Sequence, residues 1–374
     1  MNIVISIEHP AWAHQFKYII AELMERGDNV TVLAVDKDGD LELLDKYHIP
    51  YKLMANSTGS NVFVKAWLFV KLCATYTMAC KKSGVDMLIG RLSPMMSVAA
   101  FFLRKPHVLF DDSEVCILGF TLARLFSTKM ITPRCFYNDL GEKQIKVPMY
   151  KELYYLDKKH FIPDNNVLKQ VGIDSDEKYV IVRFVAWKAS HDFGMSGLND
   201  EEKLEFVKRL SEHVKVYITS EKPLGSKLEP YRLHIPYELI HHVLYYAQVV
   251  ISDGATMASE AVVLGTHAVR LCPIKCGTFI EQEQKYGLLK WFPGATSEWF
   301  GKGLEYTIEL LKNPVLWENG KKKREILLQD MVDCNKFFID TMDSVMEEWK
   351  ENQGGGVKHE RRIYKPAYNG CIAV

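Results

Sequence analysis

The sequence has no excess of charge of either sign. Its 374 residues include 47 Lys and Arg against 47 Asp and Glu, so the formal net charge is zero. Proteins that bind nucleic acid normally carry a basic excess or a concentrated basic face, because the phosphate backbone attracts cations. The charge balance therefore argues against a nucleic-acid partner.

Cysteines with metal-ligand spacing are also lacking. The eight cysteines are scattered along the chain, and Cys272 and Cys276 have no second pair to complete a tetrahedral set. We therefore expect reduced structural thiols and no metal site.

An export signal and a long uninterrupted apolar run are missing as well. Residues 1–10 enter a strand without the basic and apolar regions of a signal peptide. The longest apolar stretch, residues 61–80, is interrupted by Lys65 and Lys71. We expect a cytoplasmic protein without a membrane span.

The same stretch contains an apolar stripe of Phe63, Trp67 and Val70 with lysines around it. This pattern favours a helix that packs on a sheet. Peripheral contact with the inner face of a membrane is the alternative.

Short apolar runs alternate with helix-length amphipathic segments, which predicts parallel sheets covered by helices on both faces. In the first half we expect strands over residues 2–7, 29–35, 51–54, 86–89, 107–110 and 129–131. The polar stretch 161–178 predicts a domain boundary, and the pattern then restarts. In the second half we expect strands near residues 179–187, 214–220, 247–252 and 267–272.

The fold expected from this pattern is α/β with two Rossmann-like domains that face each other across a cleft. We place the first domain at residues 1–165 and the second at 175–335. Residues 336–374 are expected to form a helix that returns to brace the first domain, followed by a tail.

A glycine-rich dinucleotide loop does not follow the first predicted strand. Glu8, His9 and Pro10 stand where a nicotinamide dehydrogenase would show G-x-G-x-x-G. His9 and His14 are instead candidates to reach the cleft, His9 as a general base and His14 as a substrate-binding group. For His14 the alternative is a buried core histidine.

Three carboxylates, Asp111, Asp112 and Glu114, lie within four residues after the fifth predicted strand. Their mutual repulsion is expected to raise the proton affinity of one of them and to make it a catalytic base. The alternative is ordinary capping of a following helix that Ser113 would open.

Polar residues also follow the first strand of the second half. Arg183 and Lys188 supply positive charge suited to a diphosphate, Trp187 is placed to stack on a base or sugar, and His191 is a catalytic candidate. Ser220 ends the next strand and is a further binding candidate. Surface ion pairs are the alternative use of Arg183 and Lys188.

The stretch "SDGATMASEAVVLGT", residues 252–266, begins directly after an apolar run. A glycine turn at Gly254 and a cap at Thr256 predict a helix whose first N–H groups and dipole favour an anion. Glu260 lies one turn further along the same side of that helix. Asp253, Ala255 and their neighbours would line the turn, although many βα turns look like this.

The segment "DGATMASEAVVLGT" resembles the nucleotide-binding segment of GT-B enzymes. This class includes the MurG-type N-acetylglucosaminyl transferase and UDP-N-acetylglucosamine 2-epimerase. The resemblance implies that Gly254, Ala255 and Thr256 face a diphosphate and that Glu260 bonds the ribose hydroxyls. Five further segments are similar to an uncharacterised GT-B-like family of bacterial and archaeal polysaccharide loci: "EHPAWAHQFK", "LFDDSE", "KVPMYKELYYL", "VRFVAWKASHD" and "FIEQEQKYGLL".

The resemblance implies a glycosyltransferase-like enzyme that takes a nucleotide sugar, UDP-linked by expectation, as substrate and needs no further cofactor. The acceptor would be a glycan or a lipid-linked molecule. A UDP-sugar 2-epimerase that uses Asp111, Glu114 and His191 is one alternative, and a non-catalytic nucleotide-sugar-binding subunit is another. Residues 187–192 depart from the epimerase pattern. The pattern also has a pair of Glu residues where this chain has Ser259-Glu260, and both departures disfavour epimerase chemistry. The oligomeric state stays open.

Overall fold

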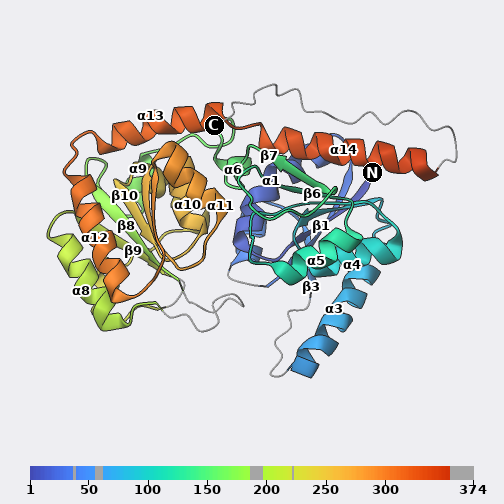
Figure 1. Cartoon of the computed structure of the whole chain (residues 1–374), viewed down its shortest axis with the longest axis horizontal. Coiled ribbons are helices and arrows are strands. Elements are labelled where there is room, and N and C mark those ends of the chain that lie inside the picture. The colour runs from blue at the N-terminus through green and yellow to red at the C-terminus, as the bar shows by residue number, and fades with distance from the viewer. Residues whose placement is uncertain (37–38, 55–61, 186–196, 221–222, 354–374) are drawn as a thin grey trace.

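The structure of the chain is a computed structural model that describes residues 1–36, 39–54, 62–185, 197–220 and 223–353. It contains two α/β lobes that lie side by side, with two long helices along one side of the molecule (Figure 1). Each lobe is built on one parallel sheet.

The first sheet has seven parallel strands in the order β3-β2-β1-β4-β5-β6-β7. Apolar, β-branched runs form most of them, as expected for strands covered on both faces. The strands are β1 (Asn2–Ile7), β2 (Asn29–Val35), β3 (Tyr51–Met54), β4 (Met87–Arg91), β5 (His107–Phe110), β6 (Lys129–Pro133) and β7 (Gln144–Val147).

Alternate side chains of these strands enter two different cores. Ile3 and Ile89 pack with the helices α1 (Pro10–Glu25) and α2 (Asp40–Lys46) on one face. On the other face, Val4 and Leu88 pack with α3 (Val62–Lys82) and α4 (Pro94–Leu103), and Leu109 packs with α5 (Ile117–Phe126). The first lobe is therefore a three-layer sandwich.

The second sheet has five parallel strands in the order β12-β11-β10-β8-β9. Its strands are β8 (Tyr179–Phe184), β9 (Lys215–Ser220), β10 (Val249–Ser252), β11 (His267–Leu271) and β12 (Leu289–Phe292). One face carries α8 (Asp200–Ser211) and α12 (Ser297–Leu311), and the other carries α9 (Ile240–Tyr246), α10 (Thr256–Val263) and α11 (Gly277–Glu281).

The remaining helices join and brace the lobes. They are α6 (Leu153–Leu156), α7 (Asn166–Gln170), α13 (Leu316–Gln329) and α14 (Cys334–Gln353), with two 3-10 turns at Glu229–Tyr231 and Tyr237–Leu239 and a π-turn at Gln282–Tyr286. Helix α13 packs on α10 of the second lobe, and α14 packs on α1 and α6 of the first (Figure 1). The predicted return of the C-terminal helix to the first domain is confirmed.

The two-domain α/β prediction is confirmed, and four of the predicted strands have the observed bounds. The sequence reasoning did not predict β7 or β12, which are short and contain lysine. The two sheets lie on either side of the predicted boundary, and the limits at 165, 175 and 335 stay predictions. Within the described part of the chain, no helix has both the length and the apolar character required to cross a bilayer.

Candidate functional site

The carboxyl ends of the two sheets meet at the junction of the lobes. Glu114, which follows β5, accepts a hydrogen bond from the backbone N–H of Gly277 at 2.9 Å, and Gly277 opens α11 after β11. The Cys135 Sγ, after β6, lies 3.8 Å from the Thr278 hydroxyl oxygen. The junction is therefore closed by direct contacts at this point.

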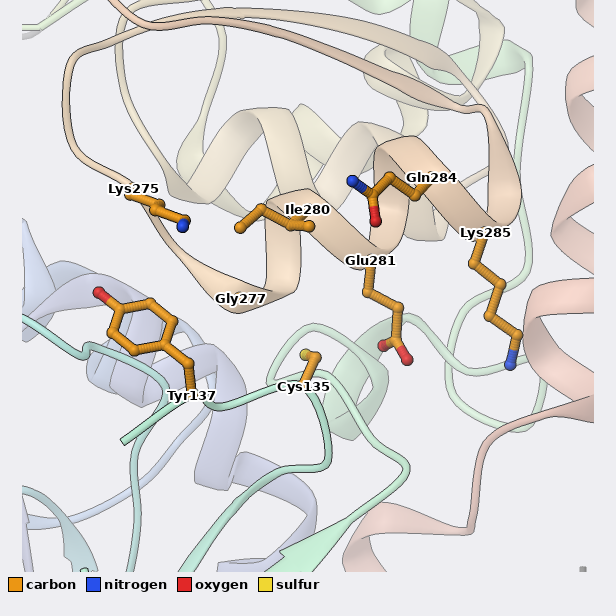
Figure 2. A pocket seen from close by; sticks show the side chains of 8 residues that line it. All are labelled: Cys135, Tyr137, Lys275, Gly277, Ile280, Glu281, Gln284 and Lys285. Atoms are coloured by element: carbon orange, nitrogen blue, oxygen red, sulfur yellow. The ribbon is translucent and has the colours of Figure 1, made fainter. Parts of the chain in front are cut away.

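A pocket of about 450 Å³ lies beside these contacts. Figure 2 shows Cys135 and Tyr137 of the first lobe facing a segment of the second lobe that carries Lys275, Glu281 and Lys285. Glu281 binds two side chains across the junction of the lobes. The Tyr150 hydroxyl donates a hydrogen bond to its Oε2 at 2.6 Å, and Arg134 forms an ion pair with its Oε1 at 3.0 Å.

The predicted ribose residue, Glu260 on α10, is buried at the same junction. Its Oε1 accepts a hydrogen bond from the Tyr155 hydroxyl at 2.8 Å and lies 3.0 Å from Nε2 of His241. Burial favours the protonated form of Glu260, but the charge and hydrogen bond of His241, helped by the hydrogen bond from Tyr155, outweigh it and lower the pKa to about 2. Glu260 is thus an ionised carboxylate held between α6 and α9.

His14 belongs to this network as a buried histidine. Its Nδ1 lies 2.7 Å from the Tyr47 hydroxyl, and its ring stacks on Tyr155 at 5.3 Å and meets His241 edge-on at 4.9 Å. Burial lowers its pKa well below the ordinary value, so the ring is neutral. Of the two interpretations drawn from the sequence, the geometry matches the core histidine.

A cluster of buried charges lies at the ends of β4 and β5. The Arg91 guanidinium lies 2.5 Å from Asp112 Oδ1, and its Nε donates to Asp111 Oδ2 at 3.1 Å. Lys151 lies 3.0 Å from Asp112 Oδ2 and 2.6 Å from Oε1 of the fully buried Glu152. The two cations offset the desolvation of the carboxylates.

These partners change the expectation for the acidic cluster. Burial raises the pKa of Asp112, but Lys151 and Arg91 outweigh it and hold that pKa well below the ordinary value. The expectation of a raised proton affinity is therefore wrong for Asp112. Burial raises the pKa of Glu114, with the Asp112 charge as a minor contributor. Ser113 does not open a helix, because α5 begins at Ile117.

The turn between β10 and α10 differs in detail from its prediction. Ala255, not Thr256, occupies the N-cap position, and no side chain in the described part of the chain caps the helix. Gly254 is required by space, since a Cβ there would lie 2.7 Å from Val185 Cγ1. Asp253 Oδ1 accepts the Val185 N–H at 2.8 Å, which ties the turn to the end of β8.

Two arginines flank this turn. Ser252, the last residue of β10, is in register with Arg183 on β8 and with Arg270 on β11. Residues paired across adjacent strands share a face, and here it is the face that α10 covers. Arg270 is buried, its Nη1 donates to the Ile274 carbonyl at 2.7 Å, and its Nε has no hydrogen-bond partner among the described residues. The strands on both sides of β10 therefore carry an arginine on the face that α10 covers.

The other predicted site residues lie at strand ends or outside the described residues. His9 caps α1, and its Nδ1 accepts the Ala11 N–H at 3.1 Å. Ser220 ends β9. Trp187, Lys188 and His191 fall within residues 186–196, outside the part of the chain that the structure describes. Among the described residues, no group of three or more His, Cys, Asp or Glu side chains is placed to hold a metal ion.

The sequence reasoning missed five residues of the junction: Arg91, Lys151, Tyr155, His241 and Arg270. A signal was present for two of them, because Lys151 and Tyr155 lie in the segment "KVPMYKELYYL" that carried part of the family resemblance. Arg91 and Arg270 are single charges inside or at the end of apolar strands. Such charges are rarely buried without a partner or a function.

Comparisons with known proteins place the fold. No protein-family model matches the chain, and no curated protein matches its sequence. Two solved structures with 12% identity and TM-scores of 0.67 are a putative UDP-N-acetylglucosamine 2-epimerase from Listeria monocytogenes and the 2-epimerase from Neisseria meningitidis bound to UDP-GlcNAc. Both alignments cover 92% of this chain, with 96% and 100% of the respective neighbour.

A glycosyltransferase shares the same architecture. The calicheamicin glycosyltransferase CalG4 aligns with a TM-score of 0.55 at 12% identity, over 92% of this chain and 98% of that one. The predicted resemblance is confirmed at the level of fold. The chain has the GT-B-type architecture of two Rossmann-like domains that is shared by 2-epimerases and GT-B glycosyltransferases.

Proposed function

We propose that the chain is a nucleotide-sugar enzyme, and specifically a glycosyltransferase that acts in surface glycan assembly. The observation that carries the proposal is the row Arg183–Ser252–Arg270 at the start of the α10 turn. Arginines on the two strands beside β10, together with the N-terminus of α10, would supply the positive charge and the donors that a diphosphate requires. The fold supports the same assignment, because a structural neighbour is bound to UDP-GlcNAc.

The nucleotide would lie along α10. The diphosphate would bind to the turn formed by Gly254, Ala255 and Thr256 and to the arginines Arg183 and Arg270. Further proposed contacts around the nucleotide are Trp187, Lys188, Ser220 and Asp253. Glu260 would accept the ribose hydroxyls, one helical turn from the diphosphate. His14 would act on the nucleotide through Tyr155 and His241 rather than by direct contact, because it is buried against both rings.

Transfer requires a base for the acceptor hydroxyl and a stabilised leaving diphosphate. His9 is our proposed base, since it lies at the end of β1 and is only half-buried. Asp112 is a weaker candidate than it was from the sequence, because Arg91 and Lys151 hold it as a carboxylate with low proton affinity. The proposed scheme uses no metal, and the nucleotide sugar is a substrate rather than a cofactor.

A UDP-sugar 2-epimerase is the second candidate, favoured by the two epimerase neighbours. It would need acid and base groups at the sugar C2, with Glu114, Asp111 and His191 as candidates. Glu114 has the raised pKa expected of an acid. A non-catalytic nucleotide-sugar-binding subunit is the third candidate.

Binding of UDP, uridine and 2′-deoxy-UDP by calorimetry tests the nucleotide site. We expect Arg183→Met to weaken UDP by about tenfold or more and to leave uridine unchanged, since a charge-assisted hydrogen bond contributes about 1.5–3 kcal/mol. Glu260→Gln should weaken UDP more than 2′-deoxy-UDP. Equal UDP binding by the wild type and both variants would refute the assignment.

Turnover separates the three candidates. Incubation with UDP-N-acetylglucosamine in the absence of acceptor should leave the sugar configuration intact if the chain is a transferase. A manno-configured product would assign the epimerase. Binding without turnover on any acceptor, with assembly activity that survives His9→Ala and Asp112→Ala, would assign the non-catalytic subunit.

A further inference from the structure

The large apolar side chains that the structure exposes are concentrated on α3, α4 and α5. These three helices hold more than half of such side chains among the described residues. Helix α3 packs on α4, and α4 packs on α5, so the three form one layer over the first sheet (Figure 1). Figure 1 also shows one end of α3 reaching past the edge of that sheet.

Helix α3 has its apolar residues on two opposite faces. Tyr76 and Cys80 face the core. Trp67, Val70 and Met78 lie on the solvent side and are 61%, 66% and 59% exposed. The prediction that this stripe packs on the sheet is therefore wrong for Trp67 and Val70. Phe63 lies among the side chains that the structure does not describe.

The neighbouring helices continue this surface. Phe101 and Phe102 are exposed at the end of α4, and the Phe101 ring lies 4.6 Å from that of Phe126 at the end of α5. Ile117 and Leu118 begin α5 and are 75% and 72% exposed. Exposed apolar groups that recur over three adjacent helices form a patch, and patches of this kind mark interaction sites.

The charge on the three helices has one sign. None of α3, α4 and α5 contains an Asp or Glu. The exposed cations on these helices or directly after them, none of which forms an ion pair with a described residue, are Lys71, Lys81, Lys82, Arg104 and Arg124. By contrast, the nearby Lys105 is paired with Asp86 at 3.7 Å.

We propose that this apolar and basic face of α3, α4 and α5 binds the surface of an anionic lipid bilayer. Apolar side chains would enter the interface between headgroups and acyl chains, and the cations would meet lipid phosphates. A second copy of the chain fits this face poorly, because a two-fold contact would set cations against cations. The proposal does not depend on the nucleotide chemistry.

The face formed by α3, α4 and α5 lies near the junction of the lobes. The start of α5 lies three residues after Glu114, which contacts the second lobe. A bilayer at this face would therefore lie close to the junction of the lobes. Such an arrangement suits an acceptor that carries a lipid anchor.

Vesicle co-sedimentation of the full chain tests the proposal. We expect binding to vesicles of phosphatidylcholine and phosphatidylglycerol, weaker binding at high salt, and little binding to phosphatidylcholine alone. Trp67→Ser with Val70→Ser should reduce the partition coefficient by about tenfold or more, and Lys81→Ser with Lys82→Ser should do the same on the anionic vesicles.

A matched pair on the other lobe serves as the control. Val315 and Ile326 are 49% and 58% exposed, and Val315→Ser with Ile326→Ser should bind vesicles like the wild type. UDP affinity and the melting temperature should stay unchanged in every variant, which shows that the fold and the nucleotide site are intact. The absence of sedimentation with anionic vesicles would overturn the proposal, as would equal loss in the control pair. The proposal would also be overturned if the protein is a dimer in solution and Trp67→Ser with Val70→Ser makes it a monomer. That result would assign the face to a second copy of the chain.

Discussion

The Tyr155 hydroxyl donates a hydrogen bond to Glu260 Oε1 at 2.8 Å, and this bond links the two lobes through a buried acceptor. Tyr155 stands on α6, which packs on α1 and α14 of the first lobe and on α10 of the second. The proposed ribose residue is therefore also part of the contact that fixes the lobes to one another.

Removal of this hydroxyl should destabilise the protein. We expect Tyr155→Phe to lower the free energy of unfolding by about 1–3 kcal/mol, because it leaves a buried carboxylate with one donor fewer. Tyr154→Phe is the matched control, since the Tyr154 hydroxyl makes a weak contact with the Met149 sulfur at 3.7 Å and has no stronger acceptor among the described residues. Urea unfolding measures both variants, and equal losses would contradict the role given to the bond.

Gly277 should tolerate no larger residue. A Cβ there would lie 2.0 Å from the Cys135 carbonyl oxygen of the other lobe. We expect Gly277→Ala to lower the free energy of unfolding by roughly 1–3 kcal/mol and to weaken the contact between the two lobes. Thermal unfolding and small-angle scattering measure the two effects. Gly301→Ala on α12 should be neutral or stabilising by up to about 1 kcal/mol, because a Cβ there would meet no described residue within 4 Å outside its own helix backbone.

Arg91→Met should be among the most damaging single substitutions in the first lobe. It would leave Asp111 without its guanidinium and Asp112 with Lys151 alone, at a cost of about 3–5 kcal/mol. Lys302→Met breaks the exposed pair with Glu298 and should cost less than about 0.5 kcal/mol. Similar losses in the two variants would show that the buried cluster is not a stabilising unit.

Stability should fall as the pH falls from 7 to 5. His107 is buried against Ser127, with Nδ1 2.9 Å from the hydroxyl, and burial lowers its pKa to about 3. The unfolded chain binds a proton near pH 6.5 and the folded chain does not, so acid favours unfolding by about 2 kcal/mol at pH 5 for this residue alone.

The histidine variant isolates that contribution. Between pH 7 and pH 5, the free energy of unfolding of His107→Asn should fall by about 2 kcal/mol less than that of the wild type, as measured by urea unfolding. His213, which is exposed, provides the control, and His213→Asn should follow the wild type. An unchanged pH dependence in His107→Asn would show that the folded and unfolded chains protonate this ring alike, and would contradict the lowered pKa of His107.

The sequence predicted elements better than it predicted contacts. Strands such as β1 and β2 are long β-branched runs, and their burial on both faces made the pattern unambiguous. The four residues of β7 and of β12 contain lysine and alternate weakly, so their pairing with a neighbouring strand decides their state.

The site depends on distances that a linear pattern does not contain. Arg91 and Asp112 are 21 residues apart and meet because β4 and β5 are neighbours in the sheet. Tyr155 and Glu260 are 105 residues apart and meet only because of how the lobes sit together. The clustered carboxylates indicated a raised proton affinity, and two cations from other elements reversed it for Asp112.

The final helix changes how the first domain can be made. The Phe338 ring of α14 packs on the rings of Phe16 and Tyr154, with centroid distances of 5.7 Å and 6.3 Å. The last described helix therefore completes the interior of the first domain. During synthesis, the amino-terminal half must wait for residues 334–353 to leave the ribosome before its interior is sealed. A nascent chain that stops between the two domains carries an open hydrophobic groove, which is where chaperone binding or early misassembly would begin.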